Sequence, residues 1–312
     1  MAETLLVYHR TEADEIVRLL REGGYPGPIL RATAPEEATA LSPEAEILLA
    51  GRFPAEAMER ARRLRWIQSL WAGVEQWMSL PIPDGVVLTR MVGPFGPLIA
   101  QYVFAHLLAH AYHIDLFRQQ QARREWKQHR PERLMGRVLG VAGLGAIGTE
   151  IARLGQALGM RIRGLNRSGA PHPLAERVFP VRDVREFVRE VDYLVLVLPN
   201  TPETYHLFDR SVLENLKPGA VLVNVGRGAT VDEAALADVI RSGRIRLAVL
   251  DVFETEPLPP ESPLWDLPGV VITPHCSGPT VPADAVPVFL ENYRRWVSGE
   301  PLLGVVDRQR GY

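Results

Sequence analysis

The sequence predicts an α/β protein made of two doubly wound parallel-sheet domains, and three observations predict it. The chain of 312 residues is long for one hydrophobic core and typical of two domains. Short, nearly continuous apolar runs alternate with helix-like stretches, which is typical of parallel sheets covered by helices on both faces. One such run, in VLGVAGLGAIGTEIA (138–152), leads into a helical pattern through three closely spaced glycines.

The first hundred residues predict the smaller domain. Apolar runs rich in β-branched and aromatic residues predict five strands, at 5–9, 29–32, 46–50, 66–70 and 86–91. Stretches with helical spacing predict helices at 12–22 and 54–64. Because strands and helices alternate, this part also predicts a sheet covered by helices.

The larger domain repeats the alternation with longer elements. Its apolar runs predict strands at 138–143, 161–165, 193–199, 220–226, 247–253 and 270–275. The stretches between them predict helices at 146–158, 183–191, 209–216 and 231–243. The regular order of strand and helix indicates a doubly wound sheet.

Two clusters of glycine and proline mark the domain boundaries. They are VGPFGP (92–97) and HCSGPTVP (275–282), and each would end the element before it. We therefore expect one domain to comprise 1–97 and 282–312, and the other to comprise 98–281. The last helix, 283–297, would then return to the first domain.

The composition excludes several classes of protein. A formal net charge of −2 gives no reason to expect a nucleic-acid partner. The apolar stretch 97–117 contains Gln101, three histidines and Asp115, so it predicts a buried or interface helix and no membrane span. Cys276 is the single cysteine, and the first residues lack the pattern of a signal peptide. We therefore expect a cytoplasmic protein without an intramolecular disulfide.

The glycine turn predicts a dinucleotide site. Gly143 permits the tight turn, Gly145 lets a pyrophosphate approach the backbone, and Gly148 lets the helix and strand pack closely. The helix would start at Ala146 and Ile147, with the phosphates at its N-terminus.

The residue type after the second strand predicts which dinucleotide binds. NAD sites usually carry an acidic residue there, but this chain has Asn166, followed by Arg167 and Ser168. A guanidinium and hydroxyl donors suit a 2′-phosphate, which a carboxylate would repel. NADP is therefore the preferred cofactor, and NAD stays open because Arg167 is also compatible with a solvated loop in an enzyme that accepts either cofactor.

Three residues near strand ends of the larger domain are candidates for catalysis. Arg227, Glu256 and His275 all follow predicted strands, where ligands of open α/β sheets bind. An arginine can hold a carboxylate through two parallel hydrogen bonds, and a histidine can transfer a proton at neutral pH. A carboxylate beside the histidine would keep it protonated and oriented.

The chain resembles the D-isomer-specific 2-hydroxyacid dehydrogenases over essentially its whole length. The resemblance lies in a set of stretches that occur in the family's order: IQSLWAGVE, VLGVAGLGAIG, LVLPNTPETYHLF, VNVGRGATVDEAAL, AVLDVFETEPLPPESPLW and VITPHCSG. The segment NRS (166–168) makes the chain most similar to the NADPH-preferring glyoxylate/hydroxypyruvate reductases. The resemblance implies a Rossmann domain and a discontinuous flavodoxin-like substrate domain, with the active site between them.

The resemblance also implies a role for each site residue. Arg227 would hold the α-carboxylate of a 2-oxoacid, His275 would protonate its keto oxygen, and Glu256 would orient His275. Backbone amides of Ala72, Gly73 and Val74 would bind the substrate carboxylate, and Trp71 before them would either narrow the pocket toward short oxoacids or pack in the core. The cofactor would be bordered by Leu198, Pro199, Thr204, Val225, Gly226 and Asp251.

Other interpretations of the sequence stay open. His106, His110 and His113 share one predicted helix face, which fits polar contacts across an interface better than a metal site, so no metal is expected. Cys276 adjoins His275, but neighbours in sequence usually point apart, which disfavours a thiol nucleophile. A homodimer through the helical region 98–130, anchored by Trp126, is expected. The alternatives in function are a dinucleotide-sensing protein of the same fold and a dehydrogenase for a larger 2-oxoacid.

Overall fold

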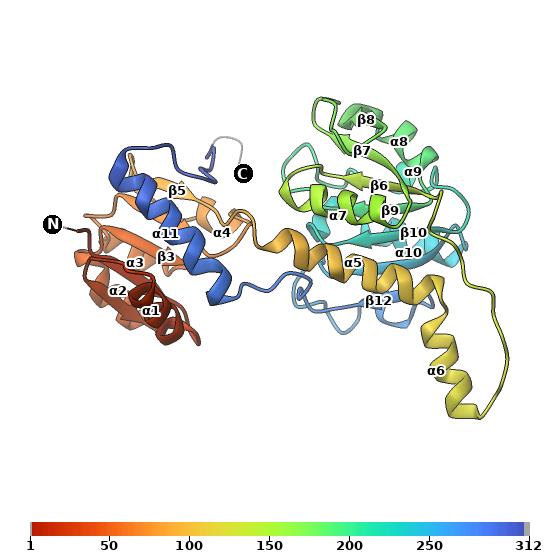
Figure 1. Cartoon of the computed structure of the whole chain (residues 1–312), viewed down its shortest axis with the longest axis horizontal. Helices are drawn as coiled ribbons and strands as arrows, with labels where there is room; N and C mark the ends of the chain where they lie inside the picture. Colours follow the sequence, from red (N-terminus) through yellow and green to blue (C-terminus); the bar gives the residue numbers. More distant parts are fainter. Residues whose placement is uncertain (1, 309–312) are drawn as a thin grey trace. The chain divides into compact units, whose positions relative to one another are not determined.

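The computed structural model describes residues 2–308, which form two compact units. Unit 1 comprises 1–95 and 279–312, and unit 2 comprises 96–278 (Figure 1). The boundaries expected from the glycine and proline clusters lie two and three residues further along the chain. Each unit contains one parallel sheet with helices around it, so the predicted fold class is confirmed. No helix in the described part of the chain is long and apolar enough to span a membrane.

The sheet of unit 1 has five parallel strands in the order β2-β1-β3-β4-β5. The strands are β1 (Leu5–Tyr8), β2 (Ile29–Ala32), β3 (Ile47–Ala50), β4 (Trp66–Ser69) and β5 (Val87–Thr89). The central strands β1, β3 and β4 are buried along their whole length, which explains their continuous apolar sequences. β1 lies between β2 and β3. The chain therefore moves from β1 to one edge of the sheet at β2, and then continues on the other side of β1 through β3, β4 and β5.

Helices cover both faces of this sheet. They are α1 (Ala13–Glu22), α2 (Pro35–Leu41), α3 (Ala55–Arg60), α4 (Glu75–Met78) and α11 (Pro282–Ser298). α1 packs against α11, and α2 packs against α3. The indole of Trp66 stacks on the ring of Phe289 from α11, with the ring centroids 5.2 Å apart. The C-terminal helix is therefore part of the core of unit 1.

The sheet of unit 2 has seven parallel strands in the order β12-β11-β10-β9-β6-β7-β8. The strands are β6 (Val138–Ala142), β7 (Arg161–Asn166), β8 (Arg177–Pro180), β9 (Tyr193–Leu196), β10 (Ala220–Asn224), β11 (Ile245–Leu250) and β12 (Val270–Ile272). β6 pairs with β7 on one side and β9 on the other. The order reverses between β6 and β9, which is where open α/β sheets bind ligands.

The helices of unit 2 other than α6 lie on the two faces of its sheet, and α6 extends away from it (Figure 1). They are α5 (Phe95–Ala111), α6 (Ile114–Arg123), α7 (Ala146–Ala157), α8 (Val184–Glu190), α9 (Arg210–Leu213) and α10 (Glu233–Arg241). α8, α9 and α10 pack in a row over one large buried cluster that includes Phe187 and Phe208. The carboxylates of Asp209 and Asp232 accept backbone N–H bonds at the starts of α9 and α10.

The predicted helix over 97–117 is wrong in one respect, because it is broken into α5 and α6. His113 has a φ of +55° and ends the continuity of the two helices. Its ring Nε2 lies 3.0 Å from the carbonyl oxygen of Arg130, away from the line of α5. His106 and His110 therefore share α5, but His113 does not belong to their helix face. The helical region also ends at Arg123, so Trp126 lies outside it.

Other elements differ from the prediction at their ends or were missed. The helix predicted at 54–64 stops at Arg60, because Ala61 leaves helical geometry with ψ of 57°. β8 and α2 were not predicted, since RVFP is a short edge strand and PEEATAL has only one fully buried residue. Short elements with little buried surface leave a weak periodic pattern.

Candidate functional site

The glycine turn between β6 and α7 has a closed side and an open side. Gly143 has a φ of +102°, and a Cβ there would lie 2.6 Å from the carbonyl oxygen of Val197. A Cβ on Gly148 would overlap the carbonyl oxygen of Gly143. At Gly145, in contrast, no heavy atom of residues 2–308 lies within 4 Å of such a Cβ, apart from those of Gly145 and its two chain neighbours. The backbone at Gly145 can therefore be approached closely from outside.

The start of α7 suits an anion. Thr149 is the first residue whose N–H bonds back to Gly145, with N and O 2.9 Å apart. The N–H groups of Ala146, Ile147 and Gly148 therefore have no acceptor within the helix and form its positive end. The first turn of α7 contains no acidic residue. These groups fit the pyrophosphate of a dinucleotide.

The loop after β7 is shaped by the side chains that replace the usual acid. Asn166 donates from Nδ2 to the carbonyl oxygen of Ala170 at 2.9 Å and accepts at Oδ1 from the N–H of Gly169 at 2.6 Å. The Ser168 hydroxyl oxygen accepts from the N–H of Ala170 at 3.3 Å. Arg167 is exposed, and its Nε lies 3.7 Å from a carboxylate oxygen of Glu203. Asn166 and Ser168 thus fix the loop that carries the Arg167 guanidinium.

Residues after β9 and β10 line the same edge of the sheet as the glycine turn. Leu198 and Val225 are nearly buried, and a Cβ on Gly226 would lie 2.9 Å from the backbone of Leu198. The Thr204 hydroxyl donates to the carbonyl oxygen of Pro199 at 2.6 Å. The two loops therefore pack tightly against each other. Their part in holding the cofactor stays a prediction.

His275 and Glu256 come together although 19 residues separate them. His275 Nδ1 lies 2.8 Å from Glu256 Oε2, and Glu256 Oε1 accepts from the N–H of Phe253 at 3.0 Å. Both carboxylate oxygens are therefore used, one by the backbone and one by the imidazole. The imidazole is half exposed, and its Nε2 is the nitrogen not held by this carboxylate. The pair can deliver a proton from Nε2 to a bound molecule.

Asp251 anchors the loop that carries His275. It is fully buried, and its carboxylate accepts from the N–H groups of Cys276 and Ser277, each at 2.9 Å, and from the hydroxyl of Thr273 at 2.6 Å. Its own carbonyl oxygen accepts from the N–H of His275 at 2.9 Å. These bonds fix the backbone on both sides of His275. The predicted contact of Asp251 with a nicotinamide stays a prediction.

Tyr102 extends this anchor to α5, and no pattern in the sequence indicated its role. Its hydroxyl lies 2.6 Å from the hydroxyl oxygen of Thr273. Since the Thr273 proton goes to the Asp251 carboxylate, Tyr102 is the donor in this contact. Burial raises the pKa of Tyr102 to about 12, so the phenol keeps its proton at neutral pH. The ring of His106 packs on Tyr102 with centroids 4.6 Å apart, and burial lowers the pKa of His106.

Arg227 follows β10 and is held by its own turn. Its carbonyl oxygen accepts from Asn224 Nδ2 at 3.1 Å and from the Thr230 hydroxyl at 2.7 Å. Its Nη1 donates to the carbonyl oxygen of Gly226 at 2.7 Å. Arg227 thus lies at the carboxyl edge of β10, as the pattern of strands predicted. Its contact with a substrate stays a prediction.

In unit 1, the segment after β4 presents unused backbone donors. The N–H groups of Ala72, Gly73 and Val74 have no acceptor within residues 2–308. The segment is fixed beside them, because Gln76 Nε2 donates to the carbonyl oxygens of Gly51 at 3.0 Å and Gly73 at 3.3 Å. Three consecutive free N–H groups on a fixed backbone can bind a carboxylate.

Trp71 does not pack in the core of unit 1. It is half-buried and lines a cavity of about 570 Å³ in that unit, while Trp66 and Trp77 are fully buried. The predicted effect of Trp71 on the length of the substrate stays a prediction.

The structure also describes the side chains named in the metal and thiol interpretations of the sequence. Residues 2–308 contain no group of three or more His, Cys, Asp or Glu side chains placed to hold a metal ion. Cys276 is exposed, and the partial desolvation of its sulfur, together with the nearby Asp251 carboxylate, raises the pKa of the thiol further above neutral. It would be protonated at neutral pH, which does not suit a nucleophile.

Comparisons with known proteins agree on one family. Residues 104–277 match the family described as "D-isomer specific 2-hydroxyacid dehydrogenase, NAD binding domain". The matched region contains the glycine turn, Arg227, Glu256 and His275.

Solved structures resemble the chain over its whole length. A D-isomer specific 2-hydroxyacid dehydrogenase family protein from Aeromonas salmonicida subsp. salmonicida is 40% identical, with a TM-score of 0.91, over 99% of this chain and 100% of that one. A relative from Xanthobacter autotrophicus, in complex with NADPH and MES, is 32% identical, with a TM-score of 0.90, over 100% of both chains. An NADPH-dependent glyoxylate/hydroxypyruvate reductase from Sinorhizobium meliloti, in complex with NADP and sulfate, is 27% identical, with a TM-score of 0.87, over 99% and 100%.

Proposed function

Since the chain belongs to the D-isomer specific 2-hydroxyacid dehydrogenase family and is an NAD(P)-dependent enzyme, we propose that it reduces short 2-oxoacids to D-2-hydroxyacids. Glyoxylate and hydroxypyruvate are the proposed substrates. The match to an NADPH-dependent glyoxylate/hydroxypyruvate reductase supports this choice. The pairing of His275 with Glu256 is the observation that carries the proposed reaction.

The proposed mechanism assigns one task to each group. The start of α7, at Gly145 to Gly148, holds the pyrophosphate of the dinucleotide. The reduced nicotinamide supplies the hydride when it is bound. Arg227 neutralises the carboxylate of the 2-oxoacid and polarises its keto oxygen. His275 gives its Nε2 proton to that oxygen, and the Glu256 carboxylate stabilises the imidazolium before the transfer.

Unit 1 contributes a second set of donors to the proposal. The three free N–H groups of Ala72, Gly73 and Val74 bind a carboxylate of the substrate. Trp71 lines the cavity beside this segment and limits its width.

The experiment that tests the proposal follows nicotinamide absorbance with glyoxylate and with hydroxypyruvate. We expect the absorbance of the reduced nicotinamide to fall with both acids and to stay constant when no 2-oxoacid is added. Chiral analysis of the product should give the D-isomer from hydroxypyruvate. A protein that binds NADPH tightly but reduces neither acid would contradict the proposed substrates and favour a larger 2-oxoacid.

We further propose that NADP is preferred over NAD, with Arg167 binding the 2′-phosphate. Replacing Arg167 by alanine should weaken NADPH binding about tenfold or more and change NADH binding little, because only NADPH carries the extra phosphate. Titration of protein fluorescence with each nucleotide measures both affinities. The matched variant Glu203→Gln removes the carboxylate beside Arg167 and should strengthen NADPH binding. Equal losses for both nucleotides in Arg167→Ala would refute this role.

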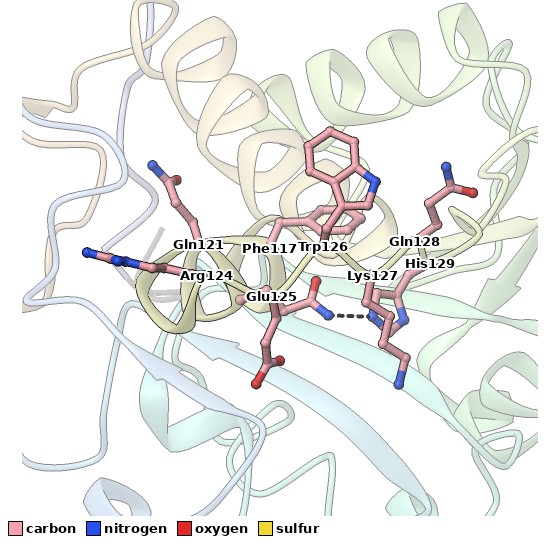
Figure 2. A pocket seen from close by; sticks show the side chains of 9 residues that line it. Phe117, Gln121, Arg124, Glu125, Trp126, Lys127, Gln128 and His129 are labelled. Carbon is pink, nitrogen blue, oxygen red and sulfur yellow. Dashed lines mark hydrogen bonds between the residues drawn. The ribbon is translucent and has the colours of Figure 1, made fainter.

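A homodimer formed through the segment 112–129 is also proposed. Five of the twelve large exposed hydrophobic side chains of residues 2–308 lie in this segment: Tyr112, Ile114, Leu116, Phe117 and Trp126. α6 and the residues after it extend away from the sheet of unit 2 (Figure 1). Figure 2 shows Phe117 and Trp126 at a cavity of about 590 Å³ that this segment forms by itself. Apolar side chains gathered on one extended segment suit the self-complementary contact of a symmetric dimer.

Replacing Trp126 by alanine is expected to weaken this dimer. The Trp126 side chain is 97% exposed, so its loss should leave the fold of one subunit intact while it removes a large apolar contact. Sedimentation equilibrium should show about twice 34.8 kDa for the unaltered chain and a lower average mass for the variant. Trp265→Ala, at an exposed tryptophan elsewhere, is the control that should stay dimeric. A mass near 34.8 kDa for the unaltered chain would contradict the proposal.

A further inference from the structure

We infer that the cavity of unit 1 binds a second acid group of the substrate, so that 2-oxoacids with a distal carboxylate or phosphate are preferred over uncharged ones of the same length. This inference rests on the proposed reduction of 2-oxoacids and specifies the substrate class. The cavity has a volume of about 570 Å³ and lies entirely within unit 1.

The cavity lies where this sheet is expected to bind a ligand. Its walls include Tyr8, the last residue of β1, and Gly51, the first residue after β3. β1 and β3 are neighbours, and the strand order reverses beside them, with β2 on one side and β3, β4 and β5 on the other. Open α/β sheets bind ligands outside the carboxyl ends of strands at such a point.

The charges around the cavity favour an anion. Arg10 and Arg52 line it, whereas no aspartate or glutamate among residues 2–308 does. Neither Arg10 nor Arg52 forms an ion pair with any residue between 2 and 308. Most other arginines of unit 1 have an acidic partner, as Arg31 has in Asp14. Two guanidinium groups at one cavity without acids suit a carboxylate or phosphate.

Two acidic groups on the adjoining elements contact other residues, and one of these, His9, lines the cavity. Glu12, at the start of α1, has a carboxylate oxygen 3.5 Å from Nε2 of His9. Glu37, in the first turn of α2, accepts from the N–H of Thr33 at 2.8 Å. Neither carboxylate lines the cavity. The positive charge of the two arginines is therefore not cancelled at its walls.

Trp71 forms a tightly packed wall of the cavity and directly precedes the segment Ala72 to Val74, which is proposed to bind the substrate carboxylate. The indole of Trp71 packs on Gly51 so closely that a Cβ there would lie 2.7 Å from the ring. The Arg52 guanidinium lies over the same indole, 5.2 Å from the ring centroid, which orients it at the cavity. Trp71 directly precedes the free N–H groups of Ala72 to Val74. When these N–H groups bind one carboxylate of a 2-oxoacid, the remaining part of the substrate lies next to the wall of the cavity.

The test compares pairs of 2-oxoacids that differ only in the distal charge. The pairs are 2-oxoglutarate with 2-oxopentanoate and oxaloacetate with 2-oxobutanoate, and phosphohydroxypyruvate against hydroxypyruvate separates a phosphate from a carboxylate. We expect kcat/KM to be about tenfold or more higher for the charged member of at least one pair, because each arginine adds a charge-assisted hydrogen bond. The preference should fall as salt is added, since both arginines are exposed.

Variants connect the preference to the cavity. Arg10→Met and Arg52→Met should each lower kcat/KM for the acid with the distal charge about tenfold. For the acid without the distal charge, kcat/KM should stay within about threefold of its original value. Arg62→Met, at an exposed arginine of the same unit that does not line the cavity, should change neither. Equal kcat/KM values within all pairs, with glyoxylate still reduced, would overturn this inference and leave the proposed function standing.

A binding measurement separates the two proposals further. Calorimetry with succinate and with its uncharged diamide, succinamide, should show binding of succinate alone, and Arg52→Met should abolish it. If no 2-oxoacid is reduced, the proposed function falls, and the calorimetry still decides whether the cavity is an anion site. Equal behaviour of succinate and succinamide would overturn the anion site itself.

Discussion

Replacing His275 by alanine is expected to lower kcat by about two orders of magnitude or more, because the keto oxygen then lacks its proton donor. The imidazole is the group that Glu256 holds, with Nδ1 and Oε2 2.8 Å apart, and its Nε2 stays available for transfer. Nucleotide binding should change little, since the glycine turn lies in a different loop. Steady-state kinetics with hydroxypyruvate and a nucleotide titration measure the two effects separately.

A second variant guards this prediction against a backbone effect. His275 has a φ of +51°, where alanine is strained but asparagine is tolerated. His275→Asn should therefore keep the loop in place and still lose about the same factor in kcat. Glu256→Gln keeps a side chain that can accept the bond from Nδ1 but removes its charge, so we expect a smaller loss. Near-normal turnover in both His275 variants would show that His275 is not the proton donor.

The effect of Arg227→Ala should be of similar size but of different kind. The guanidinium neutralises the substrate carboxylate, so its loss should raise KM as well as lower kcat. A variant at His275 should act mainly on kcat. The pattern of the two parameters therefore distinguishes the proton donor from the group that binds the carboxylate.

The strands and the glycine turn could be predicted because their causes are local. A strand buried on both faces needs a continuous apolar run, as in β1, β9 and β10, and such runs are visible in the sequence. A turn that admits only glycine is equally visible. The seven parallel strands of unit 2 include only one, β8, that the sequence did not predict, and it is the edge strand with the weakest pattern.

The connections around His275 could not be predicted from spacing. Tyr102 lies 171 residues from Thr273, and Thr273 lies 22 residues from Asp251, so the three hydroxyl and carboxylate groups meet only after folding. The pairing of His275 with Glu256 was implied by the family resemblance and not by periodicity. The break at His113 likewise depends on a single left-handed residue, which helical spacing cannot show.

Replacing Gly148 by alanine is expected to destabilise unit 2, whereas the same change at Gly145 should not. A Cβ on Gly148 would overlap the Gly143 carbonyl oxygen and lie 3.1 Å from the Val141 side chain. Both are fixed by the turn and by β6, so the clash cannot be relieved by rotating a side chain. We expect the free energy of unfolding to fall by about 3 kcal/mol, at the upper end for overpacking. Chemical denaturation followed by fluorescence measures it.

Gly145→Ala provides the matched control, because the same methyl group meets no atom of residues 2–308 within 4 Å beyond its two chain neighbours, and the φ of −81° suits alanine. The free energy of unfolding should change by less than about 1 kcal/mol, the usual cost of losing a glycine at this position of a helix. Dinucleotide affinity should nevertheless fall about tenfold or more, since the methyl group would occupy the space through which a pyrophosphate approaches the backbone. Gly148→Ala should therefore lower the free energy of unfolding, whereas Gly145→Ala should lower the dinucleotide affinity. If Gly145→Ala bound NADPH and NADH as tightly as the unaltered chain, the open side of the turn could not be the pyrophosphate site.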